Sequence, residues 1–340
     1  MRTILCVIML LLACVPARAA GLRVLVSIPP AAWFVRQVAG DLAEVQVMIP
    51  VGASPHAYEP KPSQMVAVGQ ADLYLAIGVE FEETWLPKLL GVNPEMQVVH
   101  LDEGIAKLSM AEHGHDGYAE KAASHQQGQR QGRESAHGSG QGHGAIAAVA
   151  HGEGQGDNAA QALHGSPEGA SPHEPHGLDP HVWLSPALAA TLVGNANRAL
   201  AQADPQHAAQ YEANARQTLA RITALRSELA PLFKDLPLRR FLVFHPSWGY
   251  FAHEFGLEQM PIEVQGREPS PRELHDLVRG AKAHGVRAVF VQPQMSRRTA
   301  QVVADELGGH VVLADPLAGD WEANLRRVAL ELAAAMKEEH

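Results

Sequence analysis

The segment DPQHAAQYEANARQTLARITALRSELAPLF, residues 204–233, decides the fold. Asp204 followed by Pro205 is a typical helix start, because an acidic N-cap residue precedes a proline in the first helical position. Apolar residues then recur at three- and four-residue spacing, which predicts a helix that ends near Phe233. These residues are Tyr211, Ala215, Leu219, Ile222, Leu225 and Leu229. Nearly thirty residues at about 1.5 Å each extend about 43 Å, enough to cross a whole domain.

Short apolar runs typical of buried strands lie on both sides of this helix. Four precede it, at residues 23–28, 45–49, 73–78 and 97–101. Four follow it, at residues 240–244, 259–263, 287–292 and 310–314. Segments 31–40 and 62–71 have helical spacing between the first strands. This alternation predicts an α/β fold of two (βα)4-type lobes with mostly parallel sheets, joined by one long rigid helix.

Composition excludes several classes of protein. A hydrophobic content of 46% in 340 residues is normal for a globular core and excludes a wholly disordered or collagen-like chain. The net charge of −10 argues against nucleic-acid binding, since phosphates are neutralised by basic patches. No run of about twenty apolar residues follows the N-terminus, so an integral membrane bundle is also excluded.

The N-terminus predicts export. Residues 1–19 combine Arg2, an apolar run and the A-x-A cleavage pattern of a signal peptide, which places the mature chain in the periplasm. The alternative is lipid anchoring at Cys14, within a poor lipoprotein cleavage box. Cleavage after Ala19 removes both cysteines, Cys6 and Cys14. A metal site in the mature chain must then use imidazole and carboxylate ligands.

A histidine-rich segment interrupts the first lobe. We expect an N-terminal lobe at residues 20–111, a disordered insertion at 112–177, the end of the lobe at 178–203, the linking helix at 204–235 and a C-terminal lobe at 236–340. The insertion is either an exposed loop that captures zinc weakly or a tolerated low-complexity segment. Its candidate low-affinity ligands are His113, His115, His125, His137, His143, His151, His164, His173 and His176.

Four metal-competent side chains stand at positions where ligands of open α/β sheets gather. His56 follows the second strand, His245 and Asp315 come directly off later strands, and His181 lies where the ordered pattern resumes after the insertion. Ligands bind beyond the carboxyl ends of parallel strands, often between lobes. Three imidazoles and one carboxylate suit a tetrahedral Zn²⁺ site. For any single histidine, a surface position or a hydrogen-bonded core position is the alternative.

Six segments resemble one protein family and follow its motif order over essentially the whole mature chain. These segments are PHAYEPKPSQ (55–64), DPHVWLSP (179–186), FHPSWGYFAHEFGL (244–257), EPSPREL (268–274), FVQPQMS (290–296) and ADPLA (314–318). They resemble the metal receptors (cluster A-I) of bacterial ABC importers, and most closely the zinc-uptake, ZnuA-like, substrate-binding proteins.

The resemblance implies two lobes bridged by one long helix, with the metal held between them. It implies the metal ligands His56, His181, His245 and Asp315. Manganese and iron receptors tend to place a glutamate at the third position, so His245 favours zinc. Some zinc members carry an acidic residue beside the first histidine, where this chain has Pro55. The fourth ligand is therefore either Asp315 or water.

The expected function is capture of periplasmic Zn²⁺, as transported ligand, by a monomeric receptor. Its partners are the membrane permease and the ATPase of a zinc ABC importer. A manganese or iron receptor is the alternative within this class; a metal-binding surface adhesin and a zinc hydrolase are the alternatives outside it. Catalysis is not expected because neither H-E-x-x-H nor G-x-S-x-G occurs. Glu263 and Glu268 are expected to orient ligands rather than act as bases.

Overall fold

The computed structural model describes residues 21–110, 177–264 and 266–337. The predicted signal peptide, Cys14 and the nine histidines of the insertion therefore lie outside the described residues. In the part of the chain that is described, no helix is both long and apolar enough to cross a membrane.

The N-terminal lobe is a parallel four-stranded sheet in the order β2-β1-β3-β4. Its strands are β1 (Leu22–Val26), β2 (Ala43–Val47), β3 (Leu73–Ala76) and β4 (Gln97–His100). Its helical elements are α1 (Pro29–Ala39), η1 (Gly40–Leu42), α2 (Pro62–Val68), α3 (Glu80–Val92), η3 (Val182–Leu184) and α5 (Pro186–Ala203). Each of the four predicted strands forms, with its ends shifted by at most two residues.

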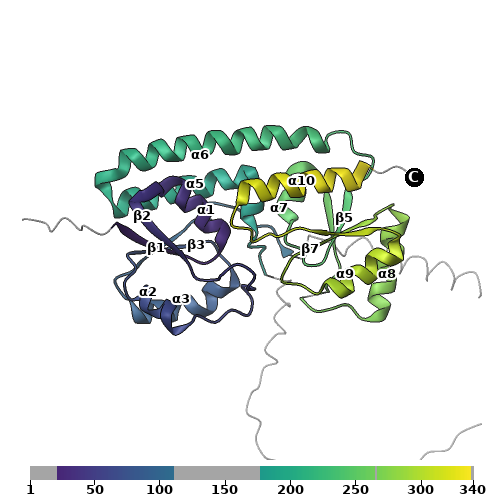
Figure 1. Ribbon diagram of the computed structural model, residues 1–340, viewed down its shortest axis with the longest axis horizontal. Coiled ribbons are helices and arrows are strands. Elements are labelled where there is room, and N and C mark those ends of the chain that lie inside the picture. The colour runs from purple at the N-terminus through teal and green to yellow at the C-terminus, as the bar shows by residue number, and fades with distance from the viewer. Residues whose placement is uncertain (1–20, 111–176, 265, 338–340) are drawn as a thin grey trace, which may run out of the picture.

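The C-terminal lobe repeats this topology, with a parallel sheet in the order β6-β5-β7-β8. Its strands are β5 (Arg240–Val243), β6 (Glu258–Pro261), β7 (Ala288–Val291) and β8 (His310–Leu313). Its helices are α7 (Gly249–Phe255), α8 (Pro271–Ala283), α9 (Arg297–Leu307) and α10 (Trp321–Lys337). The predicted fold class of two parallel α/β lobes is confirmed (Figure 1).

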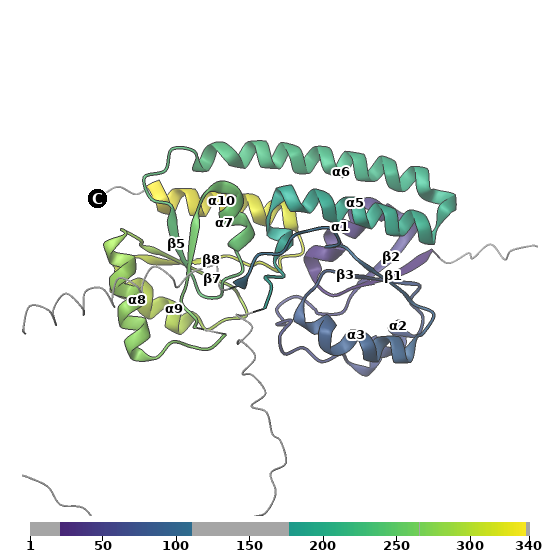
Figure 2. The ribbon, with the colours of Figure 1, turned by 180° about the vertical axis from the view of Figure 1, so that it is seen from behind.

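The long helix α6 (Ala208–Leu229) runs over both lobes (Figures 1 and 2). Its α-helical part is shorter than the sequence predicts, because Pro205–His207 form a 3-10 turn, η4, and a second 3-10 turn, η5 (Ala230–Phe233), follows it. Asp204 holds the first turn, since its Oδ2 lies 2.6 Å from His207 Nδ1 and accepts a hydrogen bond from Tyr211 Oη at 2.8 Å. The 22 residues of α6 extend about 33 Å.

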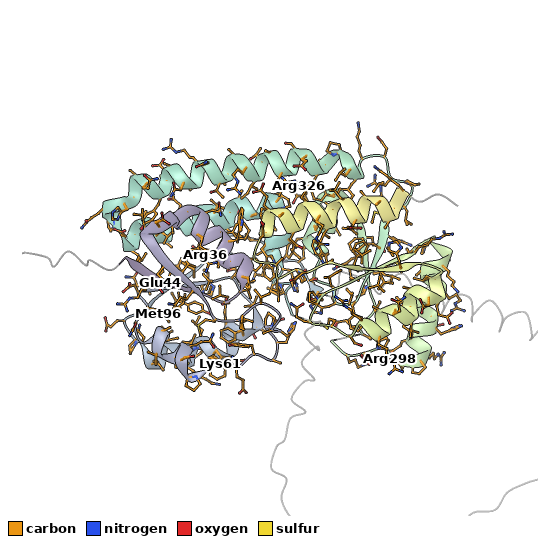
Figure 3. All side chains as sticks on the ribbon, viewed as in Figure 1. Arg36, Glu44, Lys61, Met96, Arg298 and Arg326 are labelled. Carbon is orange, nitrogen blue, oxygen red and sulfur yellow. The ribbon has the colours of Figure 1, made fainter. Side chains whose placement is uncertain are left out.

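Two further helices lie beside α6, one from each lobe (Figure 2). The N-terminal lobe contributes α5, a helix that the sequence patterns above do not predict, and its N-cap residue Ser185 accepts a hydrogen bond from Leu188 N at 3.2 Å. The C-terminal lobe contributes α10, from which Arg326 reaches Glu228 of α6 at 2.8 Å (Figure 3). The three helices form a layer that fixes one lobe against the other.

One hydrophobic cluster extends through both lobes. Trp33 of α1 and Trp321 of α10 meet with ring centroids 5.0 Å apart, and Phe34 lies 5.0 Å from the same Trp321 ring. A smaller cluster lies between the second sheet and helices α8 and α9. A wide opening of the lobes would expose the shared cluster to water, so the fold favours small adjustments over a large hinge motion.

Truncating a buried residue of α6 should destabilise the protein. Leu225 is buried, so we expect Leu225→Ala to lower the free energy of unfolding by about 2–5 kcal/mol through lost contacts and a residual cavity. Ser227→Ala, on the exposed side of the same helix, is the control and should change it by less than about 0.5 kcal/mol. Urea unfolding followed by circular dichroism measures both. Equal effects would show that α6 is not packed as described.

Candidate metal centre

A small cavity lies where loops from the carboxyl ends of both sheets meet. Its wall includes His56 and His181 from the N-terminal lobe and His245 from the C-terminal lobe. The cavity offers about 20 Å³ to the centre of a water-sized sphere. That is room for a single ion or water molecule.

His56 stands on the loop between β2 and α2, in the motif PHAYEPKPSQ. Two residues of this motif hold the loop: Tyr58 Oη donates to Gln64 Oε1 at 2.7 Å, and Gln64 Nε2 donates to Met48 O at 2.5 Å, just past the end of β2. The His56 side chain remains 42% exposed, and its Nδ1 lies 3.4 Å from Glu80 Oε1 at the start of α3. The loop thus presents His56 at the mouth of the cavity.

His181 is buried and held by the aspartate two residues before it. Its backbone N donates to Asp179 Oδ1 at 2.8 Å, and its Nδ1 lies 2.7 Å from the same oxygen. An ionised carboxylate can only accept, so Nδ1 carries the proton and Nε2 keeps a free lone pair. The following Trp183 donates from Nε1 to Pro316 O at 2.7 Å, which joins this segment to the C-terminal lobe.

His245 follows β5 directly and is also buried. Its Nδ1 lies 2.6 Å from Oε1 of the buried Glu263, which follows β6. The turn after His245 is fixed by Gln259, whose Oε1 accepts from Trp248 N at 3.0 Å and whose Nε2 donates to Pro246 O at 3.1 Å. Nε2 of His245 is buried, and no described residue gives it a hydrogen-bond partner. A buried nitrogen without a hydrogen-bond partner, beside two other imidazoles, is the arrangement expected of a metal ligand.

The three imidazoles converge. The ring centroids of His56 and His245 are 5.3 Å apart, and those of His181 and His245 are 5.4 Å apart. Two imidazoles that share a tetrahedral ion at 2.0–2.1 Å per nitrogen have centroids about 5 Å apart. Within the described ranges, no three His, Cys, Asp or Glu side chains are already arranged to hold an ion. Joint ligation therefore needs side-chain rotations from this arrangement.

Each ring has a carboxylate beside its Nδ1, and together these lower the electrostatic potential of the cavity. The pairs are His56 with Glu80, His181 with Asp179, and His245 with Glu263. Burial lowers the pKa of His56; Glu80 opposes this effect, while His245 and His181 add to it. His56 is therefore neutral at pH 7, the form that binds a metal.

Asp315, the fourth predicted ligand, is placed differently from the three histidines. Its Oδ1 accepts a hydrogen bond from Leu317 N at 2.9 Å, and its backbone O accepts one from Asn324 Nδ2 at 2.7 Å. The cavity wall includes the next two residues, Pro316 and Leu317, rather than the Asp315 side chain. The structure thus brings the three histidines together and leaves the carboxylate of Asp315 beside the cavity.

The sequence predicts Glu263 as a residue that orients a ligand, but it does not predict three other residues of the site. Asp179 and Glu80 are not predicted as partners of His181 and His56, and Gln294 is not predicted as part of the cavity wall. The motif D-P-H holds a signal for Asp179, because an acid two residues before a histidine can reach its Nδ1. Glu268 is not one of the residues of the cavity wall, and its Oε1 lies 3.5 Å from Thr299 Oγ1.

The described residues on either side of residues 111–176 are hydrogen-bonded to each other close to His181 in the chain. Met110 N donates to Gly177 O at 3.2 Å, and Asp179 N donates to Leu108 O at 2.8 Å. Tyr250 of α7 fixes this junction from the other lobe, because its Oη accepts from Leu108 N and donates to Asp179 O, both at 2.9 Å. The two residues that flank 111–176, Met110 and Gly177, are thus paired close to a candidate ligand.

Comparisons with known proteins match most of this chain to one family. The family model for the zinc-uptake complex component A, periplasmic (ZnuA), matches residues 24–335. The high-affinity zinc uptake system protein ZnuA of Bacillus subtilis (strain 168) is 27% identical over 300 residues, 88% of this chain and 79% of that protein.

Solved structures extend the agreement to the fold. A crystal structure of ZnuA is 34% identical with a TM-score of 0.72, covering 93% of this chain and 99% of that one. A ZnuA deletion mutant with zinc bound is also 34% identical, with a TM-score of 0.73, covering 94% and 100%. The resemblance found in the sequence motifs is confirmed, and the chain belongs to the family of the zinc-uptake complex component A.

Proposed function

We propose that this protein is a high-affinity receptor that captures Zn²⁺ between its lobes and delivers it to an ABC importer. The observation that carries the proposal is the convergence of His56, His181 and His245 on one ion-sized cavity. The names of the zinc-uptake relatives support zinc as the transported ligand. The ion leaves as it entered, so the role requires no catalytic step.

The ligand chemistry favours zinc over manganese or iron. Imidazole nitrogens suit Zn²⁺, whereas carboxylate and water oxygens suit Mn²⁺. The carboxylates of Asp179 and Glu263 face Nδ1 atoms, where they orient the rings instead of binding the ion. The fourth position is taken by Asp315 or by water.

The partners follow from the family. We propose that a monomer hands its ion to a membrane permease driven by a separate ATPase. Export to the periplasm through the predicted signal peptide would place the receptor beside that permease. The histidines of residues 112–177 would act as an accessory zinc-capturing segment, rooted next to His181 through Asp179 N and Leu108 O.

Removing one imidazole should abolish tight zinc binding. We expect His56→Ala to weaken the zinc affinity by more than about 100-fold, because one of three nitrogen ligands is lost while the exposed position leaves the fold intact. His275→Ala is the matched control, since the His275 side chain is 75% exposed and lies on α8. Competition titration against a zinc chelator measures both. Equal affinities for the two variants would remove the basis of the proposal.

Neutralising an orienting carboxylate should have a smaller effect. We expect Glu263→Gln to lower the zinc affinity about 10–100-fold, since an amide holds the His245 Nδ1–H less strongly and makes the ring less basic. Glu268→Gln, which alters a carboxyl that faces Thr299 and not a histidine Nδ1, should leave the affinity unchanged. The same titration, with thermal melting of the zinc-free variants to check folding, tests this. An unaltered affinity for Glu263→Gln would contradict the orienting role.

Zinc affinity should fall with pH. Protons compete with zinc for the imidazoles, so binding weakens as the rings protonate. The lowered pKa of His56 keeps this ring neutral to a lower pH than an ordinary histidine, so its share of the loss begins below about pH 6.5. Calorimetric titrations at about pH 7 and about pH 5 should show a large loss of affinity at the lower value. Undiminished binding there would show that imidazoles are not the ligands.

A further inference from the structure

Gln294 is a cavity residue that the proposed ligand set does not use. It follows β7 in the segment Gln292-Pro293-Gln294-Met295, and it is one of the residues that form the same wall as the three histidines. Both polar atoms of its amide, Oε1 and Nε2, are buried, and no described residue gives either one a hydrogen-bond partner. A buried amide without partners destabilises a fold, so such a group calls for an explanation.

The carboxylates near the histidines already face imidazole rings or backbone groups. Asp179 and Glu263 face the Nδ1 atoms of His181 and His245. The Asp315 carboxylate accepts from Leu317 N, and its side chain does not contribute to the cavity wall. Gln294 and Nε2 of His245 are thus unsatisfied groups in one small cavity.

A tetrahedral zinc ion with three imidazoles has one position left. The cavity, with about 20 Å³ for the centre of a water-sized sphere, has little room beyond the ion and a small fourth ligand. A water molecule on zinc is a strong hydrogen-bond donor, and an uncharged amide oxygen is a suitable acceptor for it. A direct bond from the amide oxygen to the ion is less suitable, because zinc prefers nitrogen, sulfur and carboxylate ligands.

We propose that Gln294 is a positioning residue whose amide oxygen accepts a hydrogen bond from a water molecule that is the fourth ligand of zinc. The inference rests on the proposed function and decides between its two candidates for the fourth position. It assigns to Asp315 the task of shaping the turn that carries Pro316 and Leu317.

The test compares Gln294→Leu with Gln301→Leu in the full mature chain. Gln301 makes a matched control, because it is exposed on α9 and donates to Asp305 Oδ1 at 2.7 Å. We expect Gln294→Leu to weaken zinc binding about 10–100-fold, the usual effect of losing a partner of a metal ligand. The melting temperature of the zinc-free protein should not fall, because leucine removes two unsatisfied polar atoms.

A spectroscopic measurement separates positioning from simple packing. With Co²⁺ in place of zinc, the visible absorption bands report the ligand set, so Gln294→Leu should alter them and Gln301→Leu should not. A crystal structure of the zinc-loaded protein should show Gln294 Oε1 about 2.7–3.0 Å from a water oxygen on the ion.

Three results would overturn the proposal. They are an unchanged cobalt spectrum and affinity in Gln294→Leu, a zinc-loaded structure with the Asp315 carboxylate on the ion, and a loss of affinity in Asp315→Asn as large as that in His56→Ala. Asparagine at position 315 keeps the oxygen that accepts from Leu317 N, so the last result would identify a ligand and not a broken turn. If the unaltered protein fails to bind zinc at all, the proposed function itself is wrong, which is a different outcome.

Discussion

The short contact between a carboxylate and the Nδ1 atom of a buried imidazole is the constraint on which the site depends. It occurs at 2.7 Å between Asp179 and His181 and at 2.6 Å between Glu263 and His245. Each carboxylate fixes the tautomer, so that Nε2 turns its lone pair toward the cavity. Because one pair belongs to each lobe, the site exists only while the lobes keep their relative position. The layer of α5, α6 and α10 and the hydrophobic cluster that both lobes share therefore stabilise the site as well as the fold, because they hold the two lobes in place.

Hydrogen bonds between the lobes reinforce that position close to the metal site. Trp183 donates to Pro316 O, and Trp321 of α10 donates from Nε1 to Trp183 O at 2.6 Å. On the helical side, Glu254 of α7 accepts from Arg226 of α6 at 2.7 Å and from the backbone N of Ala187 at 3.1 Å. The two tryptophan contacts are buried, whereas the contacts of Glu254 lie at the surface. Of the three histidines, His56 is the one most exposed to solvent.

Much of this architecture could be predicted because it is encoded locally. Short apolar runs predict all eight strands of the described residues. Ligands lie beyond the carboxyl ends of parallel strands, and this rule singles out His245 from its sequence position alone. Helix α5 was not predicted, although Ser185-Pro186 is a good start signal, because small alanines occupy much of its buried face and weaken the periodic pattern. Glu80 and Gln294 could not be predicted as cavity residues. Their roles depend on where other loops fold against them, which no local pattern records.

The distribution of charge explains how such a site can be selective for an ion without enclosing it in oxygen ligands. The carboxylates of Asp179 and Glu263 stand behind the rings of His181 and His245, so they attract a cation and strengthen the nitrogens without offering it an oxygen. A site with carboxylates in the inner positions would suit Mn²⁺, Mg²⁺ or Ca²⁺ at least as well as Zn²⁺. Pro55, beside His56, fits the same arrangement, because it adds no oxygen ligand at the mouth of the cavity. Placing the carboxylates of Asp179 and Glu263 behind the imidazole rings thus favours an ion that prefers nitrogen ligands.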